Sequence, residues 1–165
     1  MTYEEAYIYM KEAGKRGSIY GTATVKELLL RLENPQDQVP VVHIAGTNGK
    51  GSIFAFVEHI LEDAGYAVGR YISPTIFTYL ERFQINGHYM EEREFAQIME
   101  TVIPVCEEME ADGLPIPTAF EIETAVAFLY FVRKKADIVL LETGMGGEND
   151  ATNVVKQPRC TVLAS

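Results

Sequence analysis

The ten residues from His43 to Ser52, HIAGTNGKGS, decide the fold expected for this chain. The stretch and the residues just before it hold an apolar run, three glycines, a lysine and a hydroxyl: Val41, Val42, Ile44, Gly46, Gly49, Gly51, Lys50 and Ser52. A bound phosphate needs backbone N–H groups turned toward it, the positive end of a helix, a flexible cation, and a hydroxyl that can hold Mg²⁺. The stretch supplies all four, and it predicts a strand, a phosphate-binding loop and a helix.

Each residue type in this loop has a physical reason to be there. Gly46 and Gly49 let the backbone turn where a side chain would block the anion, and Lys50 can reach the β- and γ-phosphates. Ser52 opens the helix with its oxygen free for Mg²⁺. The sequence therefore predicts binding of a nucleoside triphosphate together with Mg²⁺.

The spacing of the loop differs from the commonest phosphate-binding form, which has four residues between the first glycine and the Gly-Lys pair. Here only Thr47 and Asn48 intervene, and Gly51 separates Lys50 from the hydroxyl residue. Thr47, Asn48 and Gly51 join the predicted nucleotide-binding residues, and the first two are candidates for direct contact. The alternative is a glycine-rich turn whose lysine is only solvated.

Strands and helices are expected to alternate along the chain. The apolar patterns predict helices over 3–13, 25–32, 50–64, 91–109 and 119–135 and strands over 41–45, 67–72, 137–141 and 161–164. Asn86-Gly87 predicts a tight hairpin turn. In the helix over 50–64, Phe54, Val57, Ile60 and Leu61 are expected on the buried face. Such alternation indicates an α/β fold, a parallel sheet flanked by helices.

Ligands of such sheets bind beyond the carboxyl ends of the strands. This rule gathers the loop that begins at Gly46, Ser73 after the second predicted strand, and Glu142 after the third. Glu142 follows the apolar run DIVLL, where a carboxylate needs a cation or donors to offset its desolvation. We therefore expect Glu142 to be a magnesium ligand that faces the phosphate loop.

The loop and a second segment resemble one family. GTNGKGS is similar to the ATP-binding loop of the folylpolyglutamate synthase and dihydrofolate synthase family in the Mur ligase superfamily. The segment Leu140–Val155, LLETGMGGENDATNVV, resembles that family's other signature. Further similarities lie between the two motifs, at Ser73-Pro74, Glu81-Arg82, Ile85-Asn86-Gly87, Thr118 and Phe120-Glu121. The resemblance runs from the N-terminus to the last residue.

The resemblance implies the ATPase domain of a Mur-type ligase, with a P-loop NTPase-like fold. It implies that a folate-type carboxylate, from folate or dihydropteroate, is joined to L-glutamate through an acyl phosphate. Lys50 and Glu142 are the implied catalytic residues, and Ser52, Ser73 and Glu142 the implied metal ligands. Capping of the turn at Pro74 is an alternative role for Ser73.

Two sites depart from the family pattern. Thr75 stands where the family has a histidine, and Glu148-Asn149 stands where it has Arg-Leu, which bears on substrate choice. The family also carries a further C-terminal domain. We therefore expect residues 1–165 to form one incomplete ATP-binding domain that lacks the C-terminal domain and does not complete catalysis alone.

The amino-acid composition and net charge limit the kinds of molecule that the chain is expected to bind. The chain is 47% hydrophobic and 23% charged, and its formal charge of −10 repels nucleic-acid backbones. No segment is apolar for long enough to cross a bilayer, and the first residues are not a signal peptide. We expect a cytoplasmic domain that binds small molecules, with no nucleic acid and no membrane; its oligomeric state is open, with a monomer as the default.

Two other functions remain open at this point. One is a Mur-type ligase that joins an amino acid to a cell-wall precursor, although its loop more often lacks the residue corresponding to Gly51. The other is a nucleotide-binding module without ligase activity, which Glu148 permits.

Overall fold

A six-stranded sheet forms the centre of the computed structural model, which describes residues 1–17, 20–144 and 146–164. The strand order is β4-β3-β2-β5-β1-β6. The strands are β1 (Val41–Gly46), β2 (Val68–Tyr71), β3 (Phe83–Ile85), β4 (His88–Tyr89), β5 (Ile138–Glu142) and β6 (Cys160–Ala164). β2, β5, β1 and β6 are parallel, whereas β3 and β4 are antiparallel. The predicted α/β class with a mainly parallel sheet is confirmed.

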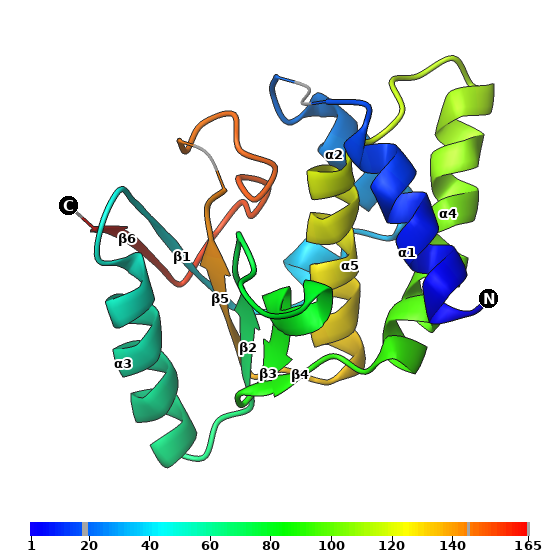
Figure 1. The fold of residues 1–165 in the computed structure, drawn as a ribbon. Helices are drawn as coiled ribbons and strands as arrows, with labels where there is room; N and C mark the ends of the chain where they lie inside the picture. The colour runs from blue at the N-terminus through cyan, green and yellow to red at the C-terminus, as the bar shows by residue number, and fades with distance from the viewer. Residues whose placement is uncertain (18–19, 145, 165) are drawn as a thin grey trace.

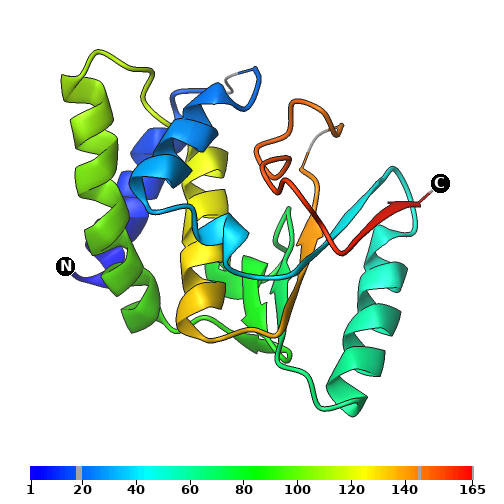
Figure 2. The same ribbon diagram turned by 180° about the vertical axis from the view of Figure 1, so that it is seen from behind.

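The helices divide unequally between the two faces of this sheet. They are α1 (Tyr3–Gly14), α2 (Ala23–Arg31), α3 (Lys50–Asp63), α4 (Glu92–Ala111) and α5 (Ala119–Arg133), with short 3-10 helices η1 (Pro35–Asp37) and η2 (Tyr79–Arg82). Figures 1 and 2 show α3 alone on one side of the sheet and the other four helices on the opposite side. The sheet therefore has a thick layer of four helices on one face and a thin layer, α3 alone, on the other.

α5 is the centre of the thick layer. It contacts α1, α2 and α4, and its residues are buried on almost every side, from Ile122 to Phe131. A helix that is apolar all round is expected in such an enclosed position. Thr118 begins α5 with a capping box, in which its hydroxyl accepts from Glu121 N while the Glu121 side chain accepts from Thr118 N.

α3 packs on the thin side through a different stripe from the one expected. Phe54 and Glu58 are buried, but Ile60 is 67% exposed, so its predicted place on the buried face is wrong. Ile53, Val57 and Leu61 pack against the small core cluster formed with Val42, Ile44, Phe54, Val68 and Leu140. The cost of burying the Glu58 carboxylate is offset by a hydrogen bond that it accepts from Arg70 Nη1 of β2 at 2.8 Å.

The predicted hairpin is present between β3 and β4. Asn86 and Gly87 adopt φ angles of 47° and 72°, the left-handed conformation that a tight hairpin turn requires. Pro104 lies inside α4, which continues past it to Ala111. In the described part of the chain, no helix is both long and apolar enough to cross a membrane.

Candidate functional site

The loop between β1 and α3 begins at Gly46, where no side chain fits. Gly46 has a φ of 136°, and a Cβ on it would lie 2.0 Å from the carbonyl oxygen of Ala164 in β6. Gly46 pairs with Ala164 in the sheet, so β6 ends beside this loop. Glycine is required at this position because the backbone of β6 fills the space that a Cβ would occupy.

α3 begins directly after this loop without a side-chain cap. Its N-cap residue is Gly49, which has a φ of 78° and accepts no cap hydrogen bond through a side chain. Thr47, Asn48, Gly49, Gly51 and Ser52 are all exposed. The first N–H groups of a helix have no partner within the helix and carry partial positive charge, so an anion is their natural ligand.

Lys50 folds back over the loop that it follows. Its Nζ donates to the carbonyl oxygen of Gly46 at 2.6 Å and lies 3.7 Å from Glu142 Oε1. The Lys50 and Glu142 side chains are 21% and 13% exposed. The ammonium is thus already held next to the loop, within reach of a phosphate placed there.

Glu142 joins the ends of three neighbouring strands. It ends β5, its backbone pairs with Ile44 of β1, and its Oε2 accepts from the backbone N–H of Ser73 at 3.2 Å. Ser73 follows β2, which is the other neighbour of β5. The prediction that the Gly46 loop, Ser73 and Glu142 meet at the carboxyl ends of the strands is therefore confirmed. Ser52 lies in the first turn of α3, with no described contact to Ser73 or Glu142.

The predicted magnesium site can be tested against its donor set. The described residues contain no group of three or more His, Cys, Asp or Glu that could hold a metal. Mg²⁺ differs from metals that need such a cage, because it takes one or two carboxylates, keeps several waters and uses substrate phosphates as ligands. Glu142 with the hydroxyls of Ser52 and Ser73 fits that pattern only with a nucleotide present.

The hairpin side of the site holds a buried ion pair that the sequence did not reveal. Arg82 contacts Glu123 Oε2 of α5, and Glu123 Oε1 accepts from the Tyr79 hydroxyl at 3.0 Å. The Arg82 guanidinium also lies over the Tyr79 ring, 4.4 Å from its centre. Burial raises the pKa of Glu123, and the charge of Arg82 opposes that rise. The signal was a carboxylate in the apolar run of α5, which needs a partner.

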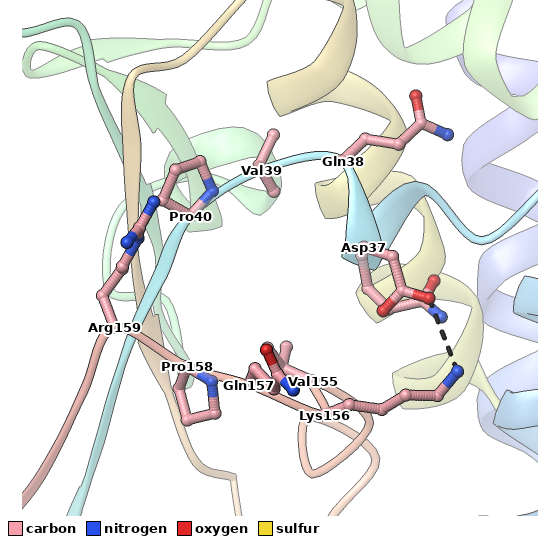
Figure 3. Close-up of a pocket in the computed structure, with 10 residues that line it drawn as sticks. Asp37, Gln38, Val39, Pro40, Val155, Lys156, Gln157, Pro158 and Arg159 are labelled. Carbon is pink, nitrogen blue, oxygen red and sulfur yellow. Dashed lines mark ion pairs between the residues drawn. The ribbon is translucent and has the colours of Figure 1, made fainter.

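Two cavities lie at opposite ends of the sheet. One, of about 740 Å³, lies between residues 36–40 and 155–159, before β1 and β6 begin, and the Lys156–Asp37 ion pair closes one side of it (Figure 3). The other, of about 240 Å³, is lined by His43, Ala45, Thr143, Gly147, Asn153, Thr161, Val162 and Leu163. Only the smaller one is at the carboxyl ends, where the phosphate loop lies.

The known proteins that this chain resembles in sequence and in structure carry the same family name. The dihydrofolate synthase/folylpolyglutamate synthase of Bacillus subtilis is 41% identical over 164 residues, which are 99% of this chain and 38% of that protein. The solved folylpolyglutamate synthase of Thermotoga maritima is 41% identical with a TM-score of 0.88, and the match covers 96% of this chain and 37% of that one. The chain belongs to the folylpolyglutamate synthase/dihydrofolate synthase family. No model of a protein family matches the chain.

A further member of the family was solved as a complex of folylpolyglutamate synthase with the ATP analogue AMPPCP and folate. It is 32% identical with a TM-score of 0.88, and the match covers 99% of this chain and 40% of that one. The chain thus spans about two fifths of the length of each of these three family members. The two sites expected to depart from the family pattern differ in setting, since Glu148 and Asn149 are exposed and Thr75 is half-buried.

Proposed function

We propose that this chain is the nucleotide-binding part of an ATP-dependent ligase that joins L-glutamate to a folate-type carboxylate. The observation that carries the proposal is the meeting of Lys50, Glu142 and Ser73 beside an open glycine loop. A cation, a carboxylate and an uncapped helix at one place suit a nucleotide bound with Mg²⁺. The substrate class is supported by the family relation and by the relative that was solved with AMPPCP and folate.

The phosphate loop has the largest role in this proposal. Transfer of a phosphoryl group develops charge on its oxygens, and catalysis depends mainly on positioning and on charge stabilisation. Lys50 contributes a mobile positive charge, and the backbone N–H groups after Gly49 contribute fixed ones. Both are in place before the nucleotide arrives, since Lys50 is already held by Gly46 and Glu142.

Glu142, Ser52 and Ser73 are the residues that would hold Mg²⁺. When bound, this ion would supply positive charge that offsets the negative charge of the nucleotide phosphates. Glu142 is fixed by its place at the end of β5 and by the hydrogen bond from Ser73 N. A chain with a formal charge of −10 needs such a local excess of positive charge to bind a polyanion.

The proposed reaction has two steps and needs no nucleophilic side chain that forms a covalent intermediate. A carboxylate oxygen of the folate-type substrate attacks the γ-phosphorus, the bond to the β-phosphate oxygen breaks, and ADP leaves an acyl phosphate behind. The amine of L-glutamate then attacks the acyl carbon, phosphate leaves, and the amine loses a proton to give the amide. The task of the protein is to bring together reactants that all carry negative charge.

The test uses a chimera in which this chain replaces the matching two fifths of the Bacillus subtilis relative. We expect ADP formation that depends on glutamate together with dihydropteroate or tetrahydrofolate, and none with a cell-wall precursor. Turnover only with the cell-wall precursor would contradict the folate proposal. A folded chimera that binds ATP without turning over any substrate would contradict the ligase proposal and favour a nucleotide-binding module.

A further inference from the structure

The loop that follows Glu142 is held together by a buried threonine. Thr152 is fully buried, and its hydroxyl and its backbone N–H both donate to Asp150 Oδ1, the latter at 2.9 Å. Asp150 is itself 4% exposed. Near them, Asn153 Nδ2 donates to the carbonyl oxygen of Glu148 at 3.0 Å. The end of the loop is therefore a compact turn fixed by its own side chains.

Thr152 also connects this turn to the strand that carries the phosphate loop. His43 Nε2 lies 2.8 Å from Thr152 Oγ1. His43 is in β1, where it pairs with Leu141 of β5 and Thr161 of β6, and it precedes Gly46 by three residues. A carboxylate, a hydroxyl and an imidazole thus form a continuous chain from the loop after β5 to β1.

The direction of these hydrogen bonds follows from the number of protons available. An ionised carboxylate only accepts, and a hydroxyl has one proton, so the proton of Thr152 goes to Asp150. The Thr152 oxygen must then accept from His43, whose Nε2 carries the hydrogen. Burial lowers the pKa of His43, and the charge of Asp150 opposes this shift without cancelling it. The lowered pKa keeps the ring neutral at neutral pH.

Apolar packing and a polar link both hold this loop. Ala151 and Val154 are buried in the main core, and Thr143 N donates to the carbonyl oxygen of Ile44 in β1 at 3.0 Å. Gly144 packs closely against α5 and the turn, because a Cβ on it would lie 2.5 Å from Phe120 Cζ and 3.2 Å from Asp150 Oδ2. The polar chain through Thr152 adds a side-chain link from the end of the loop to β1.

We propose that Thr152 is a positioning residue that ties the loop after β5 to β1 and so sets the distance between the phosphate loop and Thr143, Gly144 and Gly147. The proposal rests on the proposed function, because it requires that the carboxylate that accepts the phosphoryl group reach the γ-phosphate of ATP between these two loops. Thr152 itself touches neither the phosphate loop nor Glu142 in the described contacts. Its effect passes through His43 on one side and Asp150 on the other.

The first test measures the histidine ring in the 165-residue chain itself. A long-range ¹H–¹⁵N correlation spectrum at pH 7.5 distinguishes the two neutral tautomers from the charged ring. We expect His43 to be neutral with its hydrogen on Nε2, and we expect Thr152→Val to alter that signal whereas Thr152→Ser preserves it. A hydrogen on Nδ1 in the unmodified chain, a charged ring, or a signal unchanged in Thr152→Val would overturn the link, whether or not the proposed function holds.

The second test measures kinetics in the chimera with the Bacillus subtilis relative. We expect Thr152→Val to lower kcat by about 10- to 100-fold, the range for losing an outer-shell partner, with KM for ATP within about twofold. Thr152→Ser should restore kcat to within about threefold of the unmodified chimera. A folded Thr152→Val chimera with unchanged kcat, or failure of Thr152→Ser to restore it, overturns the positioning role. Loss of turnover in the unmodified chimera counts against the proposed function instead, and the ring spectrum then decides whether the link itself exists.

Discussion

Lys50 Nζ lies 3.7 Å from Glu142 Oε1, although Glu142 ends β5 and Lys50 begins α3 after the loop that follows β1. The strands β1 and β5 are parallel neighbours, so their carboxyl ends carry both side chains to the same point. The ammonium is shared between this carboxylate and the carbonyl oxygen of Gly46 at 2.6 Å. A bound phosphate would therefore compete with Glu142 for Lys50, and Mg²⁺ would compete with Lys50 for Glu142.

Because of this exchange of partners, a substitution of Glu142 tests whether its carboxylate binds Mg²⁺. Glu142→Gln keeps an oxygen that can accept from Ser73 N but loses the charge that attracts Mg²⁺. We expect the gain in AMPPCP affinity on adding Mg²⁺ to fall by tenfold or more, as measured by calorimetry with the metal and with EDTA. Glu148→Gln is the control, because Glu148 is an exposed acid in the following loop. An equal loss of metal dependence in both variants would contradict the assignment of Glu142.

Gly46 offers a test of the loop geometry through stability. Gly46→Ala places a Cβ 2.0 Å from the Ala164 oxygen at a φ of 136°, so the backbone must shift. We expect a loss of about 2 kcal/mol or more in the free energy of urea unfolding. The control, Gly51→Ala, has open space around its Cβ in the first turn of α3, and it should be neutral or stabilising by up to about 1 kcal/mol. Equal effects of the two substitutions would refute the steric account.

Local signals account for the parts of this fold that the sequence predicted. The turn at Asn86-Gly87 and the strand-loop-helix at Gly46 both depend on residues adjacent in the chain. The grouping of Ser73 with Glu142 followed from the general rule for parallel sheets. Each of these predictions needed only the order and type of nearby residues.

The contacts that the sequence did not predict join residues far apart in the chain. Ile60 was placed on the buried face of α3 because it is apolar, but the stripe includes Glu58 instead, whose partner Arg70 lies in β2. In the same way, Arg82 reaches Glu123 and His43 reaches Thr152. Pair partners of this kind depend on the tertiary arrangement, and a single sequence does not reveal them.

The pair between Arg82 and Glu123 should be important for stability. Its side chains are 13% and 9% exposed, so Glu123→Gln leaves a positive charge buried without its counter-charge. We expect a loss of about 3 kcal/mol in unfolding free energy. The matched control is Glu12→Gln, which removes half of the exposed Lys15–Glu12 pair and should cost less than about 1 kcal/mol. Similar urea midpoints for the two variants would show that burial does not set the strength of the Arg82 pair.

Glu81 should make the loop between Ser73 and Tyr79 sensitive to acid. Its Oε2 accepts from the backbone N–H groups of Ile76, Phe77 and Thr78, at 3.1, 2.7 and 3.3 Å. These bonds, led by the one from Phe77, lower the pKa of Glu81 against an opposing effect of burial.

Because the folded state lowers this pKa, the contribution of Glu81 is present above the ordinary glutamate value of about 4.3 and is lost as pH falls through the lowered pKa. We expect Glu81→Gln to destabilise the chain at pH 7 and to lose this difference from the unmodified chain toward pH 3, in urea unfolding. Glu110→Gln, at an exposed glutamate of α4, is the control and should show no such convergence. A difference that stays constant with pH would rule out the carboxylate as its source.

The most direct test of a polyphosphate site at Gly46–Ser52 is calorimetric titration of this chain with AMPPCP and Mg²⁺. We expect saturable one-to-one binding, and a loss of affinity of at least 100-fold in Lys50→Met with an unchanged circular dichroism spectrum, because the ammonium next to the loop is lost. No heat of binding in the unmodified chain, or equal affinity in Lys50→Met, would contradict a polyphosphate site at this loop.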